Sequence, residues 1–157
     1  MSAHMPNRHA LLPGAGGGIG LAVAEAYLAQ GARCTVADIG STAPPALASL
    51  LKEHVARLQY VTADITRPDQ IEALLETAVS RFGVPDVLFN NAAVFALAPL
   101  LESDEAMYDR LFAVNVKGMF FVMQKVLARM VEHGVHGAVI NMASQAGRRG
   151  EALVAHY

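Results

Sequence analysis

The fold of this chain is indicated most clearly by the stretch His9-Ala10-Leu11-Leu12-Pro13-Gly14-Ala15-Gly16-Gly17-Gly18-Ile19-Gly20. Residues 9–12 form a short apolar run that predicts a buried strand, and residues 19–30 predict a helix closed by Gly31. Glycine at such a junction allows a tight turn and lets backbone N–H groups approach a phosphate at the positive end of the helix dipole. The sequence therefore predicts a phosphate-binding loop made by Gly14, Gly16, Gly17, Gly18, Ile19 and Gly20. A merely structural strand-to-helix turn is the alternative.

The same alternation of strand and helix continues along the chain. The predicted strands are residues 9–12, 33–37, 58–63, 86–89 and 137–142. The predicted helices are residues 19–30, 44–55, 68–82 and 103–132, the last of them capped by Ser103. The chain has no repeat or low-complexity linker, so this rhythm is typical of one α/β domain with a doubly wound, Rossmann-type parallel sheet.

Composition and charge exclude several classes of protein. Hydrophobic residues make up 54% of the 157 residues and charged residues 17%, which is enough for a substantial core and too apolar for a disordered chain. The net charge of −2 comes without a basic cluster and argues against a nucleic-acid surface. The histidines do not combine with cysteine or carboxylates at metal-ligand spacing, so we expect no metal site.

Three further features bear on the compartment. The lone cysteine, Cys34, sits in an apolar run, so we expect a buried, inert thiol and a reducing environment. No apolar run approaches the roughly 20 residues that span a bilayer. The N-terminus lacks the basic start and apolar stretch of a secretory signal, and residues 1–6 are expected to be a tag remnant or disordered. These features predict a soluble, cytoplasmic protein without membrane partners.

Four polar residues fall at or just past the ends of predicted strands, namely Asp38, Asp64, Asn90 and Ser144. Ligands bind at the carboxyl ends of the strands in an open parallel sheet, so these residues and the glycine loop are predicted to share one site. Asp38 follows the loop at close to the spacing of about 20 residues at which an acid holds the ribose hydroxyls of a dinucleotide. A carboxylate there repels a 2′-phosphate, and the loop holds no basic residue, so NAD is favoured over NADP. A cap for a helix or turn is the alternative role of Asp38.

The order of these motifs resembles the short-chain dehydrogenase/reductase family. Gly-x-x-x-Gly-Ile-Gly is followed by Asn90-Asn91-Ala92-Ala93, then by Asn115, Ser144 and Tyr157, and the resemblance extends along the whole chain. It implies that Asp38 and Ile39 hold the adenosine ribose end, and that Asp64 and Ile65 hold and cover the adenine. It also implies that Asn90 and Ala92 line the nicotinamide ribose side of the cofactor.

The resemblance implies an alcohol-oxidising site at Asn115, Ser144 and Tyr157. Ser144 would polarise the substrate oxygen, Tyr157 would exchange its proton, and Asn115 would join a proton relay through a water near a catalytic lysine. The chemistry is consistent with these residue types. A tyrosine with a pKa near 10 becomes a useful base only beside cations, and a serine hydroxyl can steady a developing oxyanion.

Three positions depart from the family pattern. Pro13 stands where the family usually has a hydroxyl residue, so a side-chain hydrogen bond is lost, and proline also lacks an N–H. Both losses are expected to weaken cofactor binding. Ala93 replaces a glycine and adds a methyl group near the cofactor. The chain stops at Tyr157, so the lysine of the family's Tyr-x-x-x-Lys motif would lie beyond it. We therefore expect residues 1–157 to be the N-terminal part of one domain, and not a competent enzyme as they stand.

Residues 108–113 and 141–154 are similar to those of polyol-oxidising members of the family, the bacterial sorbitol dehydrogenases. This resemblance implies oxidation of a hexitol such as sorbitol to a ketose, with Gln145 and Glu151 as substrate contacts. A solvated, salt-bridged loop of Arg148, Arg149 and Glu151 is the alternative. A short-chain reductase of another carbonyl, such as a 3-oxoacyl substrate, and a catalytically silent dinucleotide-binding module are the rival functions. In this family the long helix commonly pairs subunits, which implies a dimer or tetramer.

Overall fold

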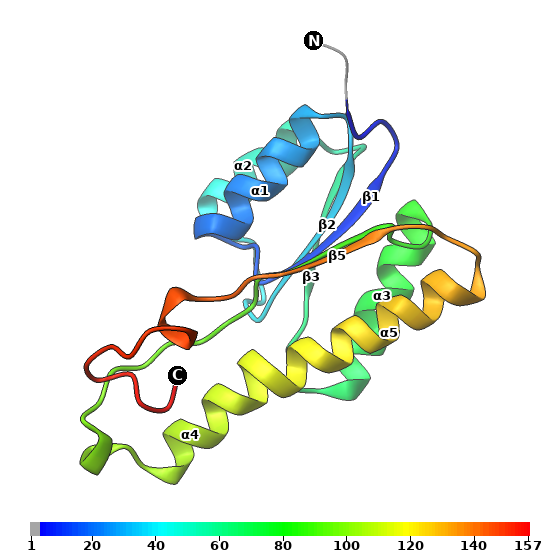
Figure 1. Cartoon of the computed structure of the whole chain (residues 1–157). Coiled ribbons are helices and arrows are strands. Elements are labelled where there is room, and N and C mark those ends of the chain that lie inside the picture. The colour runs from blue at the N-terminus through cyan, green and yellow to red at the C-terminus, as the bar shows by residue number, and fades with distance from the viewer. Residues whose placement is uncertain (1–3) are drawn as a thin grey trace.

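The computed structural model describes residues 4–157, in which a five-stranded parallel sheet lies between two layers of helices (Figure 1). The strands are β1 (His9–Pro13), β2 (Arg33–Asp38), β3 (Leu58–Thr62), β4 (Val87–Asn90) and β5 (Ala138–Asn141). The helices are α1 (Gly18–Ala29), α2 (Pro45–Glu53), α3 (Pro68–Phe82), α4 (Glu105–Phe112) and α5 (Met119–Glu132). The order of the strands in the sheet is β3-β2-β1-β4-β5, so the predicted doubly wound α/β fold is confirmed.

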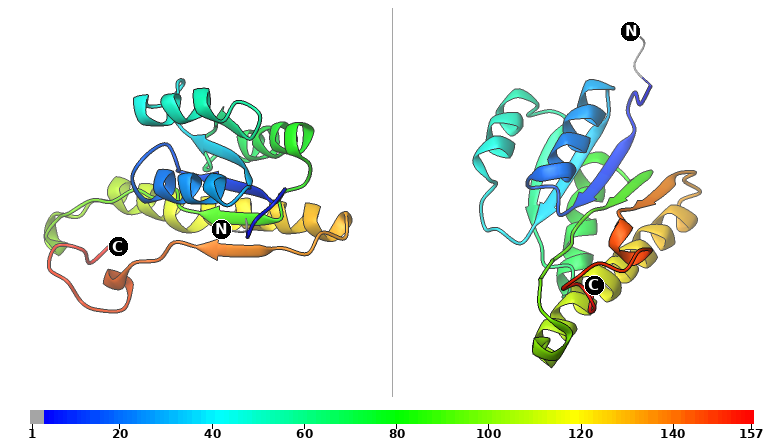
Figure 2. Two further views of the ribbon diagram at one scale, coloured as in Figure 1. Left: turned by 90° about the horizontal axis from the view of Figure 1, so that it is seen from above. Right: turned by 60° about the vertical axis from the view of Figure 1, so that its left-hand side comes forward.

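The two helical layers bury opposite faces of the central strand β1. Ala10 and Leu12 pack into the core on the side of α1 and α2, whereas Leu11 packs into the core on the side of α3 and α5. Figure 2 shows the same two layers from above and from one side. Because β1 is buried on both faces, its sequence is a continuous apolar run, as expected for a parallel strand. This arrangement places the glycine loop at the middle of the sheet edge.

Three predicted helix ends agree with the structure, and one predicted cap is wrong. Gly31, Gly83 and Gly134 follow their helices with φ of 90°, 84° and 63°, a region that glycine occupies without strain. The cap of α4 is Asp104 instead of Ser103: the Asp104 carboxylate accepts the backbone N–H of Met107 at 2.7 Å. Asp104 has the extended backbone of an N-cap, and the Ser103 hydroxyl bonds elsewhere.

Helices α4 and α5 are joined by a π-helical segment, Ala113–Gly118, into one continuous helix from Glu105 to Glu132. By length and composition this helix could cross a membrane, which differs from the expectation that no apolar segment reaches that length. On one side its residues Val122, Val126 and Met130 are buried in the core under the sheet. That packing is typical of a helix that covers a sheet.

His4 and Met5, which precede β1, are hydrogen-bonded to Gln30, the residue that follows α1. The backbone N–H of His4 donates to the Gln30 side chain at 3.2 Å, and the N–H of Met5 donates to the Gln30 carbonyl at 3.1 Å. Met5 also packs against the core. The structure thus gives His4 and Met5 defined contacts, the expectation that residues 1–6 are a tag remnant or disordered stays a prediction, and its part for residues 1–3 lies outside the described residues.

Cys34 is fully buried in β2, as the sequence predicted. Its thiol faces the Ala24 carbonyl of α1 at 3.9 Å, and burial raises the pKa of the thiol to about 12. A thiol with this pKa is almost entirely protonated near neutral pH, so Cys34 is a packing residue.

A buried polar network crosses the first three strands at the end of the sheet opposite the glycine loop. The His9 ring bonds the Gly83 carbonyl through Nδ1 at 2.7 Å and Thr35 Oγ1 through Nε2 at 2.8 Å. The Gln59 amide donates to the same Thr35 oxygen at 2.7 Å. Because a carbonyl can only accept, Nδ1 carries the proton, and Nε2 accepts the Thr35 hydroxyl. The imidazole is therefore neutral and fully hydrogen-bonded.

This network predicts a loss of stability in mild acid. Burial lowers the pKa of His9 from 6.5 to about 4. Between these two pH values His9 therefore binds a proton in the unfolded chain but not in the folded chain. The stabilisation is complete above pH 6.5 and is lost as the pH falls toward 4, by about 3 kcal/mol in the free energy of unfolding. Urea unfolding measured across this range should show the fall for the native chain. In the variant His9→Gln the free energy of unfolding should fall less over the same pH range. An equal fall in both proteins would contradict the account.

Candidate functional site

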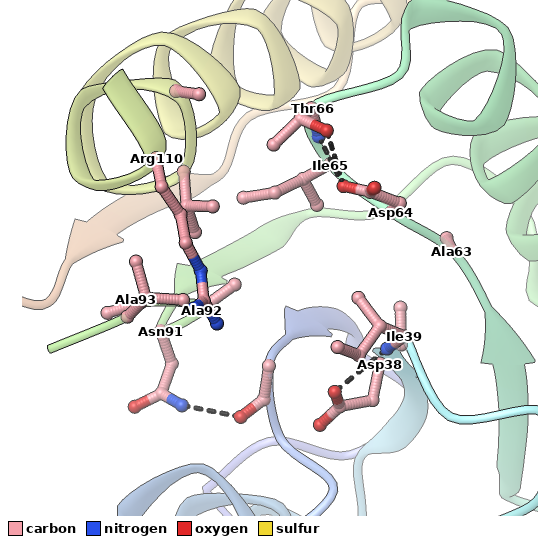
Figure 3. Close-up of a pocket in the computed structure, with 15 residues that line it drawn as sticks. Asp38, Ile39, Ala63, Asp64, Ile65, Thr66, Asn91, Ala92, Ala93 and Arg110 are labelled. Carbon is pink, nitrogen blue, oxygen red and sulfur yellow. Dashed lines mark hydrogen bonds between the residues drawn. The ribbon is translucent and has the colours of Figure 1, made fainter. Parts of the chain in front are cut away.

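A cavity of about 480 Å³ opens at the carboxyl ends of β1, β2 and β3, the volume of a typical small-ligand site (Figure 3). It receives residues from the glycine loop, from the ends of β2 and β3, from the segment after β4 and from α4. Its lining comprises Gly14, Ala37, Asp38, Ile39, Ala63, Asp64, Ile65, Thr66, Asn91, Ala92, Ala93, Val94, Arg110, Ala113 and Val114. The predicted cofactor residues Gly14, Asp38, Ile39, Asp64, Ile65 and Ala92 therefore share one cavity.

Gly14 begins the loop and allows two strands to approach each other closely. It has φ of +74°, and its N–H donates to the Ala37 carbonyl at 2.7 Å. A Cβ at Gly14 would lie 2.3 Å from the Ala92 Cα, closer than any real side chain can approach backbone. This contact ties the end of β1 to the segment after β4. Glycine is therefore required here by packing as well as by the turn.

The remainder of the loop is open at the N-terminus of α1. Gly17 caps the helix without a side-chain hydrogen bond, and Gly18 opens it with φ of +54°. Both glycines are exposed, a Cβ at either would meet nothing within 4 Å, and neither N–H donates a backbone hydrogen bond to another of residues 4–157. Ile19 is 62% exposed beside them. Free N–H groups at a helix N-terminus suit an anion such as a pyrophosphate.

Asp38 holds the glycine loop against the end of β2. One carboxylate oxygen accepts the Gly16 N–H at 3.1 Å, and the other accepts the Ile39 N–H at 2.8 Å. A Cβ at Gly16 would lie 2.6 Å from this carboxylate. The turn-capping alternative is thus part of what Asp38 does, and the same carboxylate also lines the cavity. The exposed side chain of Ile39 forms an apolar wall beside it.

Asp64 and Ile65 form the far wall of the cavity at the end of β3. The Asp64 carboxylate accepts the backbone N–H of Thr66 at 2.8 Å and its hydroxyl at 2.7 Å, which fixes the turn (Figure 3). Ile65 is buried and lies against Gly118, where any Cβ would come within 2.9 Å of it. The small residue in the helix therefore lets Ile65 sit between the helix and the cavity.

Among the cavity residues that the sequence prediction omitted are Asn91 and Arg110. Asn91 donates its side-chain N–H to the Gly14 carbonyl at 2.7 Å, and the same nitrogen lies against Gly20. Arg110 reaches into the cavity from α4 (Figure 3), and it makes no ion pair among residues 4–157. The position of Asn91 beside Asn90 at a strand end was a usable signal. Arg110, Ala113 and Val114 follow helical spacing, which becomes a signal only once α4 is known to cover the site.

A second cavity, of about 200 Å³, brings the predicted catalytic residues together. It shares Asn91, Ala92 and Ala93 with the first cavity, so the two are contiguous. Its lining comprises Asn90, Asn91, Ala92, Ala93, Asn115, Val116, Met119, Met142, Ala143, Ser144, Gly147 and Tyr157. Asn90 is fixed at the end of β4 by donating to the Asn141 side-chain oxygen at 2.9 Å. Residues far apart in sequence thus converge on one small volume.

Asn115 lies in the π-helical segment and is held by the backbone of Val94. Its side-chain oxygen accepts the Val94 N–H, and its amide nitrogen donates to the Val94 carbonyl, each at 2.8 Å. The partner of this polar side chain is therefore a peptide unit of the segment after β4. The predicted role of Asn115 in a proton relay stays a prediction, and a structural role in pinning this segment is added to it.

Ser144 and Tyr157 line the second cavity from two short turns after β5. The Ser144 hydroxyl accepts the Ala146 N–H at 3.2 Å, which fixes the serine at the start of a turn of 3₁₀ helix. Tyr157 is 38% exposed, and its ring packs edge-on against Phe95 with centroids 5.0 Å apart. Both hydroxyl groups therefore come from segments that follow the sheet, carried by local turns.

The predicted substrate contacts Gln145 and Glu151 are not brought into the site. Both side chains are exposed, and neither lines the two cavities described above. Gln145 begins a short helical turn, in which its backbone carbonyl accepts the N–H groups of Arg148 and Arg149. The structure also shows no ion pair between Glu151 and these arginines among residues 4–157. The predicted role of Gln145 and Glu151 as substrate contacts stays a prediction.

The sheet order and the glycine loop at its centre define a Rossmann-type α/β domain with a cavity at the strand ends. The chain belongs to the short chain dehydrogenase family, whose model matches residues 8–157. The predicted family membership is thereby confirmed.

Several of the proteins that this chain resembles are named as polyol dehydrogenases. The chain is 44% identical to the sorbitol dehydrogenase of Cereibacter sphaeroides over 98% of its own length and 59% of that protein. It is 42% identical to the galactitol 2-dehydrogenase of Agrobacterium fabrum over 96% of its length and 58% of that protein. The structure of NAD⁺-bound xylitol dehydrogenase superposes with a TM-score of 0.91 at 29% identity, covering 98% of this chain and 59% of that one. The chain thus spans about three fifths of the length of these relatives.

Proposed function

We propose that this chain forms the cofactor-binding part of an NAD-dependent polyol dehydrogenase that oxidises a hexitol to a ketose. One observation carries the proposal: the cavity of the glycine loop and Asp38 is contiguous with the cavity that holds Ser144 and Tyr157. A cofactor in the first cavity would therefore lie next to a hydroxyl pair in the second. The similarity to sorbitol and galactitol dehydrogenases supports a polyol as the substrate.

The residues of the chain fit a nicotinamide dinucleotide. The open N–H groups at Gly17 and Gly18 suit the pyrophosphate, and Asp38 faces the cavity as an acceptor for ribose hydroxyls. Asp64, Ile65 and Val114 line the remaining wall, where an adenine would pack. When bound, the nicotinamide supplies the hydride acceptor for alcohol oxidation.

The chain's own residues would then handle the alcohol proton. Ser144 would donate its hydroxyl hydrogen to the substrate oxygen and hold that oxygen in place. Tyr157 Oη would take the proton that leaves this oxygen as the carbonyl forms. Asn115 would keep the segment after β4 in position through the Val94 peptide. This division of labour requires Ser144 and Tyr157 to face the same volume, which they do.

The preference for NAD over NADP is proposed from Asp38. Its carboxylate would repel a 2′-phosphate, whereas free ribose hydroxyls can donate to it. Arg110 is the one basic residue that lines the cavity, and it projects from α4 on the side of Ala92 and Ala93 (Figure 3). Asp38 and Arg110 thus lie on different walls of the cavity, which leaves the carboxylate without a paired cation there.

The variant Asp38→Ala is expected to narrow the difference in affinity between NAD and NADP. NAD should bind about tenfold more weakly, because a charge-assisted hydrogen bond is lost, and NADP should bind more tightly because the repulsion is removed. Calorimetric titration of both cofactors measures this. The matched control is Asp69→Ala, an exposed carboxylate on α3 that should leave both affinities unchanged. Equal weakening of both cofactors in Asp38→Ala would show that the residue only holds the loop.

The substrate class is tested with the protein expressed from its complete gene. We expect NADH to form with sorbitol, galactitol or iditol, and the absorbance of the reduced nicotinamide reports it. Turnover of another alcohol with none of the three hexitols would contradict the polyol assignment. Preferred reduction of a 3-oxoacyl substrate would favour a reductase, and cofactor binding without any turnover would favour a catalytically silent module.

We also propose that the protein is cytoplasmic and forms a dimer or tetramer through the long helix. The long helix carries several exposed apolar side chains, among them Phe112, Val116, Phe120, Leu127 and Val131. Exposed apolar surface of this kind supports a protein–protein contact. The mass measured by light scattering tests the assembly, and a monomer at all concentrations would contradict it.

A further inference from the structure

His156, the residue just before Tyr157, is a buried polar side chain with partners on a distant segment. It is 8% exposed, whereas the Tyr157 ring beside it is 38% exposed. Its Nε2 lies 3.1 Å from the Ala96 carbonyl, and its Nδ1 lies 3.2 Å from the Ser103 hydroxyl. Both ring nitrogens are therefore engaged with residues 53 and 60 positions earlier in the chain, between β4 and α4.

The hydrogen-bond chemistry allows this ring to stay in place whether it is neutral or charged. A carbonyl only accepts, so Nε2 carries a proton in both forms. In the neutral ring Nδ1 accepts the Ser103 hydroxyl. In the charged ring Nδ1 donates to the Ser103 oxygen, and the hydroxyl then donates to the Pro99 carbonyl, which lies 3.2 Å from it. The contact therefore anchors the chain independently of the protonation state.

Two backbone bonds complete the connection around His156. The Ala98 N–H donates to the Leu153 carbonyl at 3.0 Å, and the Tyr157 N–H donates to the Val154 carbonyl at 3.0 Å. Leu153 has φ of +67°, a conformation that a residue with a side chain keeps only where its surroundings hold it. Val154 is buried beneath this turn. The turn of residues 153–157 is therefore built against the segment between β4 and α4.

The Tyr157 ring is then oriented by the same segment. Phe95 packs edge-to-face against it at an interplanar angle of 87°, one residue before the carbonyl that His156 engages. Edge-to-face packing restricts the rotation of an aromatic ring about its side-chain bonds. His156 thus fixes the backbone of Tyr157, and Phe95 fixes its ring. In Figure 1 the green segment after β4 and the red end of the chain lie at the same end of the molecule.

We propose that His156 is a positioning residue for Tyr157, which acts by clamping the turn of residues 153–157 to Ala96 and Ser103. This inference rests on the proposed function, in which Tyr157 exchanges the substrate proton. It assigns His156 no contact with substrate or cofactor. Its two ring nitrogens hold the tyrosine hydroxyl at the distance from the reacting oxygen that proton transfer requires.

The test compares His156→Ala with His156→Gln in the protein expressed from its complete gene. His156→Ala should lower kcat roughly 10²-fold, the loss that a misplacement of about 1 Å can cause, and leave the affinity for NAD unchanged. His156→Gln should recover most of kcat, because its amide can still donate to the Ala96 carbonyl. The matched control is His136→Ala: this side chain is exposed, and only its backbone carbonyl is bonded.

A spectroscopic readout separates positioning from general damage. With fluorotyrosine incorporated, the resonance of Tyr157 is identified by its absence in Tyr157→Phe. In His156→Ala this resonance should shift or broaden, while those of Tyr27, Tyr60 and Tyr108 stay unchanged. If His156→Ala does not fold, Ser103→Ala takes its place, since it removes the partner of Nδ1 and, beside that, only the hydroxyl bond to the Pro99 carbonyl.

Three outcomes would overturn the inference: an unchanged kcat in His156→Ala, an equal loss in His156→Gln, or an unchanged Tyr157 resonance. Failure of the proposed function is a different result. In that case the native protein itself neither binds NAD nor oxidises a polyol, while the Tyr157 resonance still moves in His156→Ala.

Discussion

Tyr157→Phe is expected to lower kcat for polyol oxidation about 10³-fold, the usual contribution of a positioned acid–base group. The substitution removes only the phenolic oxygen. The ring remains, so its edge-to-face contact with Phe95 and the turn to Val154 should be kept. The affinity for NAD should stay unchanged, because Tyr157 does not line the larger cavity. Steady-state rates and a cofactor titration of the complete protein measure the two effects separately.

The control for Tyr157→Phe is Tyr108→Phe. Tyr108 lies on α4, is 48% exposed and stacks on Phe112, outside both cavities. Its replacement should leave kcat unchanged. A comparable fall in both variants would attribute the loss to packing, and a nearly active Tyr157→Phe would remove tyrosine from the proposed mechanism.

Gly14→Ala is expected to abolish cofactor binding and destabilise the fold. The added methyl group would lie 2.3 Å from the Ala92 Cα and 2.5 Å from its N, and it would impose φ of +74° on alanine. The backbone strain and the overpacking together should cost about 2–4 kcal/mol. In a domain of this size the melting temperature should fall by roughly 5–15 °C. Thermal unfolding and a titration with NAD measure the two losses.

Gly150→Ala is the matched control for Gly14→Ala. No atom lies within 4 Å of a Cβ at Gly150, and its φ is outside the left-handed region. The melting temperature of this variant should equal that of the native chain. A native melting temperature in Gly14→Ala would contradict the close approach between the loop and the segment after β4.

Local pattern was sufficient to predict the fold. Each signal for an element lies within a few residues of that element, and the structure agrees with these signals. They are the five apolar runs, the glycines after the helices, and Pro45 and Pro68 at helix starts. The cap at Ser103 was misplaced by one residue because serine and aspartate are both good caps, and the sequence alone does not rank two that are adjacent.

The site was predicted in part, for a physical reason. The end of each strand is visible in sequence, so Asp38, Asp64, Asn90 and Ser144 could be assigned to one edge. Contacts that join segments far apart have no local signal. The pairing of Asn115 with Val94 and the entry of Arg110 depend on how the long helix crosses the sheet, and the bond from Asn91 to Gly14 depends on the pairing of β1 with β4. Gln145 and Glu151 line neither cavity, and their predicted role as substrate contacts stays a prediction.

The hydrogen bonds around Pro13 show what the missing N–H changes at the end of β1. Proline removes the N–H at the end of β1, yet the next residue supplies a bond, because the Gly14 N–H donates to the Ala37 carbonyl. The Pro13 carbonyl accepts the Asn91 N–H at 3.3 Å. The ladder between β1 and β2 is therefore maintained past the proline, and the expected weakening of the cofactor site stays a prediction that concerns the missing hydroxyl alone.

The central claim is that the glycine loop and Asp38 form a site for NAD, and a calorimetric titration of the complete protein with NAD and with NADP tests it most directly. We expect NAD to bind with one site per chain, and NADP to bind at least about tenfold more weakly, as repulsion between a carboxylate and a phosphate requires. Tighter binding of NADP, or no heat with either dinucleotide, would contradict the account.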